Sequence, residues 1–206
     1  MANATSSPPE GPRRVLCFGD SNTYGYDPRS YLGDRYPETV RWTGILNGAP
    51  DWSILNRGEN GRQIPHSSQA LQAAETLVSR TPAEGLVVML GTNDLLMNPI
   101  FTAEDAAGRM EALLRRLLQA ASPDARLLLV APPPLRPGAW VGEERLLIQS
   151  ARLGRCYQAL ARRLSVSFAD AGDWGVSLTF DGVHFTPEGH RAFAEGIGPR
   201  LAELLG

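Results

Sequence analysis

The sequence predicts an α/β protein, a three-layer α/β/α sandwich around a five-stranded parallel sheet in flavodoxin-like order. Five short apolar runs recur along the 206 residues without polar–apolar alternation, as is typical of strands buried on both faces. Stretches with helical spacing separate them, which favours right-handed crossovers between parallel strands. The runs lie at residues 15–18, 53–55, 86–90, 127–130 and 166–168.

The chain begins with a segment that carries no sign of packed structure. Residues 1–12 are small, polar and rich in proline, and they lack the apolar run of a signal peptide, so we expect a flexible tail. Residues 13–206 are expected to form a single domain. No stretch approaches the 18–20 apolar residues of a membrane span, so we expect no membrane span and a cytoplasmic protein. Cys17 and Cys156 lie in apolar segments and are expected to be buried free thiols.

Each of the first three strands leads into a small polar turn. Residues 19–23 read Gly-Asp-Ser-Asn-Thr, residues 56–61 read Asn-Arg-Gly-Glu-Asn-Gly, and residues 91–94 read Gly-Thr-Asn-Asp. Taken alone, each is ordinary turn chemistry. Ligands of open parallel sheets bind beyond the carboxyl ends of the strands, so the three turns together mark the candidate site.

The helices are indicated by their caps and apolar stripes. Thr102 and Asp105 form a capping-box pattern before a stripe of apolar residues over 110–118. A second stripe runs over 146–164. Thr186 followed by proline is typical of the N-cap and first position of a last helix.

A proline-rich segment at residues 132–141 follows the fourth strand. Its prolines exclude sheet pairing and a helix interior, so we expect a long loop. Long loops at this end of a sheet are often lids or subunit contacts, and a solvated connector is the alternative.

Composition excludes several function classes. The formal net charge of −2 supplies no basic stripe, so we expect no nucleic-acid partner. All 20 basic residues are Arg, and the absence of Lys excludes a P-loop lysine, a Schiff base and a Ser/Lys nucleophile pair. The histidines His66, His184 and His190 do not form a His-Glu-x-x-His pattern, so we expect no metal.

An acid and an imidazole stand three residues apart, at Asp181 and His184. With Ser21 they meet the needs of acyl transfer: a hydroxyl nucleophile, a base, and an acid that orients the base. We expect His190 to face solvent on the last helix, and His66 to lie on the surface or to line the cleft. Asp20 and Asp94 are interpreted as acceptors that hold their loops.

With these residues in place, the sequence resembles the SGNH hydrolases, also called the GDSL esterase/lipase superfamily. The resemblance covers nearly the whole chain from Arg13 onward and rests on four blocks in order, at residues 18–21, 56–61, 91–94 and 181–184. It implies that Ser21 is the nucleophile, His184 the general base and then acid, and Asp181 the residue that orients His184. The implied oxyanion hole consists of the Ser21 and Gly61 N–H groups and the Asn93 side-chain amide, with Gly58 as a competing glycine in the same loop.

Further segments are similar to the bacterial aryl esterase/acyltransferase branch, namely residues 18–26, 40–46, 89–94, 131–135 and 168–172. This resemblance implies action on short-chain esters, acyl transfer to alcohols or peroxide, no cofactor, and a homo-oligomer with a narrow channel. Asn22 stands where the best-known members carry Leu, so the polarity of the acyl or alcohol pocket departs from the branch at this point. Tyr24, Tyr26 and Trp42 are expected to line the channel or to pack beneath the nucleophile loop.

The leading hypothesis is therefore a serine esterase for short-chain carboxylic esters. The same three residues would serve a carbohydrate O-acetylesterase, a thioesterase or a lysophospholipase. A non-catalytic binding module on a flavodoxin-like fold is the alternative from another class, although the chain has no Gly-x-Gly-x-x-Gly fingerprint.

Overall fold

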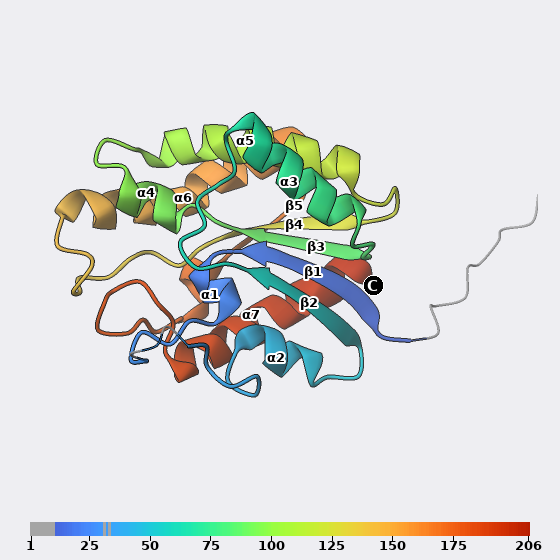
Figure 1. The fold of residues 1–206 in the computed structure, drawn as a ribbon, viewed down its shortest axis with the longest axis horizontal. Helices are drawn as coiled ribbons and strands as arrows, with labels where there is room; N and C mark the ends of the chain where they lie inside the picture. Colours follow the sequence, from blue (N-terminus) through green and yellow to red (C-terminus); the bar gives the residue numbers. More distant parts are fainter. Residues whose placement is uncertain (1–10, 31, 33) are drawn as a thin grey trace, which may run out of the picture.

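The computed structural model describes residues 11–30, 32 and 34–206, and most of the expected N-terminal tail lies outside them. One sheet of five parallel strands runs through the described residues in the order β2-β1-β3-β4-β5, which confirms the predicted flavodoxin-like order (Figure 1). The strands are β1 (Arg13–Gly19), β2 (Trp52–Gly58), β3 (Gly85–Met89), β4 (Arg126–Ala131) and β5 (Ser167–Asp170). Gly19 pairs with Gly58 on one side and with Met89 on the other, so the three polar turns leave the sheet at one edge.

Helices cover both faces of the sheet, as expected (Figure 1). One face carries α3 (Ser68–Ser79), α5 (Ala103–Ala120) and α6 (Glu144–Leu164), and the other carries α2 (Trp42–Asn47) and α7 (Pro187–Leu205). The sheet thus separates two apolar cores, one around Met110 and Leu113 of α5 and the other around Phe193 and Ile197 of α7. The short helices α1 (Ser21–Tyr24) and α4 (Thr92–Met97), with the 3-10 turn η1 (Ala171–Trp174), follow β1, β3 and β5.

The sequence signals for helix ends are confirmed. Thr102 and Asp105 form a reciprocal capping box at the start of α5, and the Thr186 side chain accepts the Gly189 N–H at the start of α7. Both cysteines are free thiols, but only Cys17 is buried; Cys156, in the middle of α6, is half-buried against the core. Among the described residues, no helix combines the length and the apolar character that a membrane span requires.

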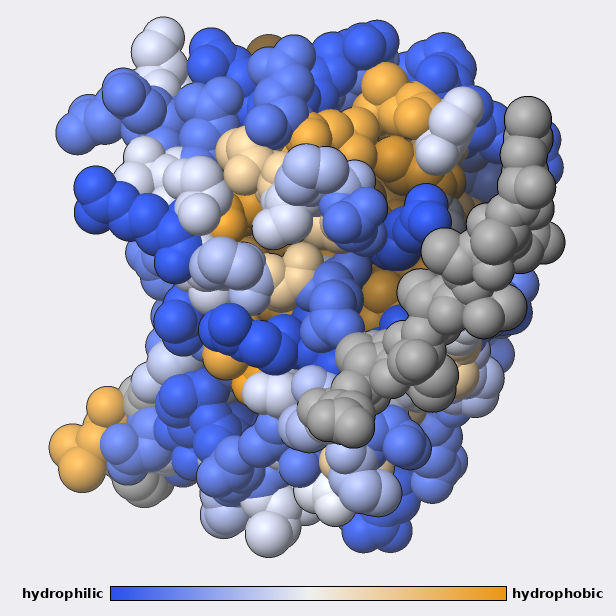
Figure 2. Space-filling model, turned by 90° about the vertical axis from the view of Figure 1, so that its right-hand side faces the viewer, coloured by the Kyte–Doolittle hydropathy of each residue, from blue (hydrophilic) through white to orange (hydrophobic). Residues whose placement is uncertain are grey.

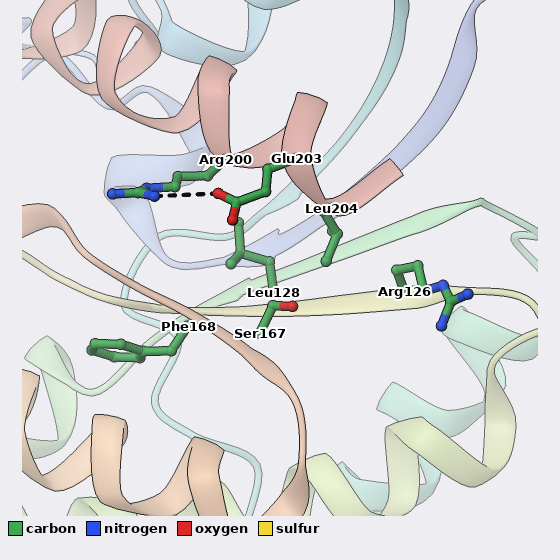
Figure 3. A pocket seen from close by; sticks show the side chains of 7 residues that line it. All are labelled: Arg126, Leu128, Ser167, Phe168, Arg200, Glu203 and Leu204. Carbon is green, nitrogen blue, oxygen red and sulfur yellow. Dashed lines mark hydrogen bonds and ion pairs between the residues drawn. The ribbon is translucent and has the colours of Figure 1, made fainter. Parts of the chain in front are cut away.

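The strands begin at the opposite end of the sheet. Figure 2 shows that face, on which hydrophobic residues gather between hydrophilic ones. A hollow of about 460 Å³ opens there between α7 and the first residues of β4 and β5 (Figure 3). Its lining includes Arg126, Ser167 and the Arg200–Glu203 ion pair. The lining residues include no histidine, and the Glu203 carboxylate is paired with Arg200 at 3.3 Å, so nothing here marks Ser167 as a nucleophile.

Candidate active site

Ser21 lies at the carboxyl end of the central strand β1, as the first residue of α1. The Asp20 side chain caps this helix by accepting the Asn22 N–H at 3.0 Å. Gly19 is required in the turn because a Cβ there would collide with the Thr23 hydroxyl and would lie 3.0 Å from the Met89 carbonyl. The turn therefore holds the Ser21 hydroxyl beyond the carboxyl end of β1, where only 5% of the residue is exposed.

His184 lies between β5 and α7 in a turn that Asp181 organises. One oxygen of the Asp181 carboxylate, Oδ1, accepts the Val183 N–H at 2.8 Å, the His184 N–H at 3.0 Å and the Thr179 hydroxyl at 2.7 Å. The other oxygen, Oδ2, lies 2.7 Å from His184 Nδ1. On its far side, His184 Nε2 lies 3.0 Å from Ser21 Oγ. The structure thus brings the three residues together as a continuous hydrogen-bonded chain across 163 positions of sequence.

The charge on Asp181 fixes the direction of this chain. Burial alone would raise the pKa of Asp181, but the hydrogen bonds from His184, Val183 and Thr179 outweigh it and lower the pKa to about 2. The carboxylate is consequently ionised at neutral pH and accepts a proton-bearing Nδ1. Neutral His184 then presents the lone pair of Nε2 to the Ser21 hydroxyl, which is the tautomer a general base requires.

Asn93 and Gly61 lie in the loops that follow β3 and β2. Asn93 is the second residue of α4 and is 8% exposed, and its Nδ2 donates to the Arg62 carbonyl at 3.0 Å. Gly61 has a φ of +72°, which favours glycine. Gly58 is required for a different reason, since a Cβ there would collide with the Tyr24 backbone. The positive φ thus favours glycine at position 61, whereas close packing requires glycine at position 58.

Charged side chains hold the loops after β2 and β3 in place. The Asp94 carboxylate accepts the Ile64 N–H at 2.9 Å and pairs with Arg109 at 2.8 Å, which agrees with its interpretation as an acceptor that holds its loop. Burial raises the pKa of Asp94, and the Ile64 N–H and Arg109 oppose that rise. Arg62 donates to the Gly19 carbonyl at 2.7 Å and lies 4.4 Å from the Phe18 ring centroid, so the Gly61 loop is fastened to the nucleophile turn.

Two aromatic side chains flank the imidazole of His184. The Tyr26 ring centroid lies 4.7 Å away and the Trp140 ring centroid 5.1 Å away, both edge-on. Trp140 belongs to the proline-rich loop, and its backbone N–H donates to the Asp181 carbonyl at 3.1 Å. Gly138 in the same loop packs so closely on Asp181 that a Cβ would collide with its backbone. The 132–141 loop is thus a wall of the site rather than a solvated connector.

The structure decides between the two expectations for Trp42 and corrects the pocket position expected for Asn22. Trp42 is fully buried, with its ring 4.8 Å from that of Phe193 and its Nε1–H donated to the Asn22 carbonyl at 3.0 Å, so it packs beneath the nucleophile turn instead of lining a channel. The Asn22 side chain faces the histidine turn, where it bonds the backbone on both sides of His184. Tyr24 is half-buried, with the Arg35 guanidinium 4.2 Å from its ring centroid. A contact between Tyr24 and substrate stays a prediction.

The two remaining histidines differ. His66 is exposed, in agreement with a surface position. His190 does not face solvent: it is fully buried, because α7 packs that face against Trp42 of α2 and against Phe185. Among the described residues, no cluster of three His, Cys, Asp or Glu could hold a metal ion.

Sequence reasoning missed the side chains that support the site. It assigned no function to Arg62 or Arg109, and it gave Asn22 a contact with substrate. Arginines in a chain with 20 of them carry no local signal, since the partners of these two lie 43 and 15 positions away. Trp140 could have been found from its place in the proline-rich loop beyond β4, which the sequence already marks as a lid or a contact.

Known proteins are similar to this chain in both sequence and fold. A model of the GDSL-like lipase/acylhydrolase family matches residues 17–192. The aryl esterase of M. smegmatis is 30% identical, with a TM-score of 0.82 over 94% of this chain and 100% of that one. A carbohydrate acetylesterase from Sinorhizobium meliloti is 28% identical, with a TM-score of 0.81 over 93% and 99%. The human isoamyl acetate-hydrolyzing esterase 1 homolog is 22% identical, over 93% of this chain and 82% of that protein.

Proposed function

We propose that this chain, which belongs to the GDSL-like lipase/acylhydrolase family and is a carboxylic ester hydrolase, cleaves short-chain esters through an acyl-enzyme on Ser21. The observation that carries the proposal is the unbroken chain of hydrogen bonds from Asp181 through His184 to Ser21. Its members are between 0% and 5% exposed, so the polar contacts act in a weakly solvated setting, where they are strongest.

The mechanism follows from this chain of contacts. Ser21 Oγ attacks the ester carbonyl carbon while His184 Nε2 takes the hydroxyl proton, and the ionised Asp181 stabilises the imidazolium that forms. The tetrahedral intermediate collapses as His184 returns the proton to the leaving alcohol oxygen, which leaves an acyl group on Ser21. His184 Nε2 then takes a proton from water as the water oxygen attacks the acyl carbon, and returns it to Ser21 Oγ as the bond between the acyl carbon and Oγ breaks and the carboxylic acid leaves.

The charge that develops on the carbonyl oxygen needs donors. We assign this role to the backbone N–H groups of Ser21 and Gly61 and to the side-chain amide of Asn93. Among the hydrogen bonds of the described residues, neither backbone N–H donates to a protein acceptor. The Asn93 amide donates to the Arg62 carbonyl through one of its two hydrogens and has a second one for the substrate.

Aromatic residues support an apolar or aryl leaving group. Tyr26 and Trp140 flank the imidazole of His184, and Trp140 is 54% exposed. An alcohol held against these rings would also compete with water for the acyl-enzyme, which would give acyl transfer. Phe180, 64% exposed beside Trp140, extends this apolar surface and suits a homo-oligomer. A carbohydrate acetylesterase is the second candidate, because a protein of that name is 28% identical and an exposed Trp also stacks on sugar rings.

The proposal is tested with p-nitrophenyl acetate and the wild-type and Ser21→Ala proteins. We expect Ser21→Ala to lower turnover by about 10⁴ to 10⁶-fold. We also expect an organophosphonate to modify wild type at Ser21, as peptide mass spectrometry would show. Retention of activity by Ser21→Ala would overturn the assignment of the nucleophile.

A series of p-nitrophenyl esters from acetate to laurate, beside acetylated sugars and acyl-CoA, separates the candidates. A preference for acetate and benzyl acetate formation in added benzyl alcohol would support the short-chain esterase with transfer. A preference for acetylated sugars would favour the second candidate.

A further inference from the structure

The side chain of Asn22 joins the nucleophile turn to the histidine turn. Its Nδ2 donates to the Val183 carbonyl at 3.1 Å, and its Oδ1 accepts the Phe185 N–H at 3.0 Å. These two backbone groups belong to the residues immediately before and after His184. The side-chain amide of the residue next to Ser21 thus bonds the backbone on both sides of His184.

The backbone of Asn22 is itself fixed. Its N–H bonds the Asp20 carboxylate at 3.0 Å, and its carbonyl accepts the Trp42 Nε1–H at 3.0 Å. The residue is 4% exposed, so water does not compete for these bonds. The direction of the side chain is consequently set by the same turn that sets the Ser21 hydroxyl.

The chemistry of the contact requires an amide. One end must donate to a carbonyl and the other must accept from an N–H, in one plane. Leu provides neither group, and an ionised Asp can accept from Phe185 but would face the Val183 carbonyl with a second negative oxygen. A protonated Asp restores both functions, since its O–H donates and its carbonyl accepts.

We propose that Asn22 is a positioning residue, which sets His184 Nε2 at hydrogen-bond distance from Ser21 Oγ. This inference rests on the proposed function. Asp181 orients the imidazole from within its own turn, whereas Asn22 fixes that turn against α1. A displacement of about 1 Å between reacting groups lowers the rate by about 10²-fold, so loss of the two bonds should lower kcat and not substrate binding.

The first test compares wild type with Asn22→Leu on p-nitrophenyl acetate and in the rate of modification by an organophosphonate. We expect kcat and the modification rate to fall together by about 10 to 100-fold, with KM changed by less than about 3-fold. A kcat within about 3-fold of wild type, or a change confined to KM, would overturn the proposal. Leu201→Ala is the matched control, because it creates a cavity in the core near the other end of α7 and should lower the melting temperature while kcat is kept.

The second test uses Asn22→Asp and separates positioning from mere stability. The ratio of its kcat to that of wild type should increase at least 5-fold as pH falls from 8 to 5, because protonation rebuilds the amide-like pair of bonds. The ratio is measured at pH values where circular dichroism shows both proteins folded. A ratio independent of pH would contradict the role given to the two bonds.

Ser21→Ala, assayed in parallel, distinguishes the outcomes. If Ser21→Ala is active, the proposed function fails. If it is inactive while Asn22→Leu turns over normally, only the positioning role fails.

Discussion

Burial of His190 makes the stability of the protein depend on pH in a defined window. The residue is 0% exposed, and its ring packs edge-on to Tyr36 and Phe185, with centroids 5.4 and 5.3 Å away. Nδ1 accepts only a long bond of 3.4 Å from the Trp42 N–H, and Nε2 has no partner among the described residues. Burial, followed by the nearby positive charge of Arg41, lowers the pKa of His190 to about 3.

The sign of the effect follows from this shift. The pKa of His190 is about 6.5 in the unfolded chain and about 3 in the folded one, so its contribution is fully present above pH 6.5 and is lost as pH falls toward 3. Between pH 7.5 and pH 5 the unfolded chain gains nearly one proton at this site and the folded chain gains none. At 1.36 kcal/mol per pH unit over roughly 1.5 units, the loss is about 2 kcal/mol.

The assay is denaturant unfolding of wild type and His190→Phe at pH 7.5 and pH 5. Phe keeps a ring in the buried site but cannot be protonated, so the comparison isolates one group and cancels the other titrations. We expect the free energy of unfolding of wild type, relative to that of the variant, to fall by about 2 kcal/mol between the two pH values. A difference that does not change with pH would refute the reasoning, because it would mean that folded His190 accepts a proton at pH 5.

Four other substitutions test the site and its supports. Asp181→Asn should lower kcat on p-nitrophenyl acetate by about 10⁴-fold, since an amide there stabilises the wrong tautomer of the base; a fall of less than 10-fold would contradict this. Asn93→Ala should lower kcat by about 10² to 10³-fold through loss of an oxyanion donor, and an unchanged kcat would remove it from that role. Arg109→Met leaves the carboxylate of Asp94 buried and unpaired, and should lower the free energy of unfolding by about 3 kcal/mol in urea titrations. Burial raises the pKa of Asp20 from 3.8 to about 6, so the free energy of unfolding of wild type falls as pH rises through this range. Between pH 5 and 7.5, the free energy of unfolding of Asp20→Asn should rise by about 1.4 kcal/mol relative to that of wild type. No rise would mean that Asp20 ionises freely.

The sequence predicted those features whose cause is local. The apolar runs predicted the five strands, and the cap at Thr102 predicted the start of α5, because each depends on neighbours within a few residues. The candidate site was predicted because its polar turns end parallel strands, which must meet at one edge of the sheet. The strand bounds were less accurate: the second strand runs from Trp52 to Gly58, well beyond the expected core of 53–55.

The errors concern side chains whose partners are distant in sequence. Helical spacing indicated an exposed His190, but the spacing does not reveal that α2, almost 150 positions away, covers that face. For Trp42 the sequence left two alternatives, lining the channel or packing beneath the Ser21 turn, because the choice depends on how α2 packs against α7. The role of Asn22 likewise depends on bonds to residues 161 and 163 positions away, which no local pattern encodes.

The site is assembled by side chains that join turns rather than by the turns themselves. Arg62 ties the Gly61 loop to the carbonyl of Gly19, Asn22 ties the nucleophile turn to both flanks of His184, and Asp94 ties α4 to the backbone of Ile64. Each connection ends on a backbone group, so it fixes a main-chain position whatever side chain stands there. A chemistry that needs a nucleophile, a base and oxyanion donors held to within a fraction of an ångström can therefore be built from four separate segments of the chain. Substitutions in these connecting residues should therefore change kcat more than KM. Removal of a wall residue such as Trp140 should not change kcat more than KM.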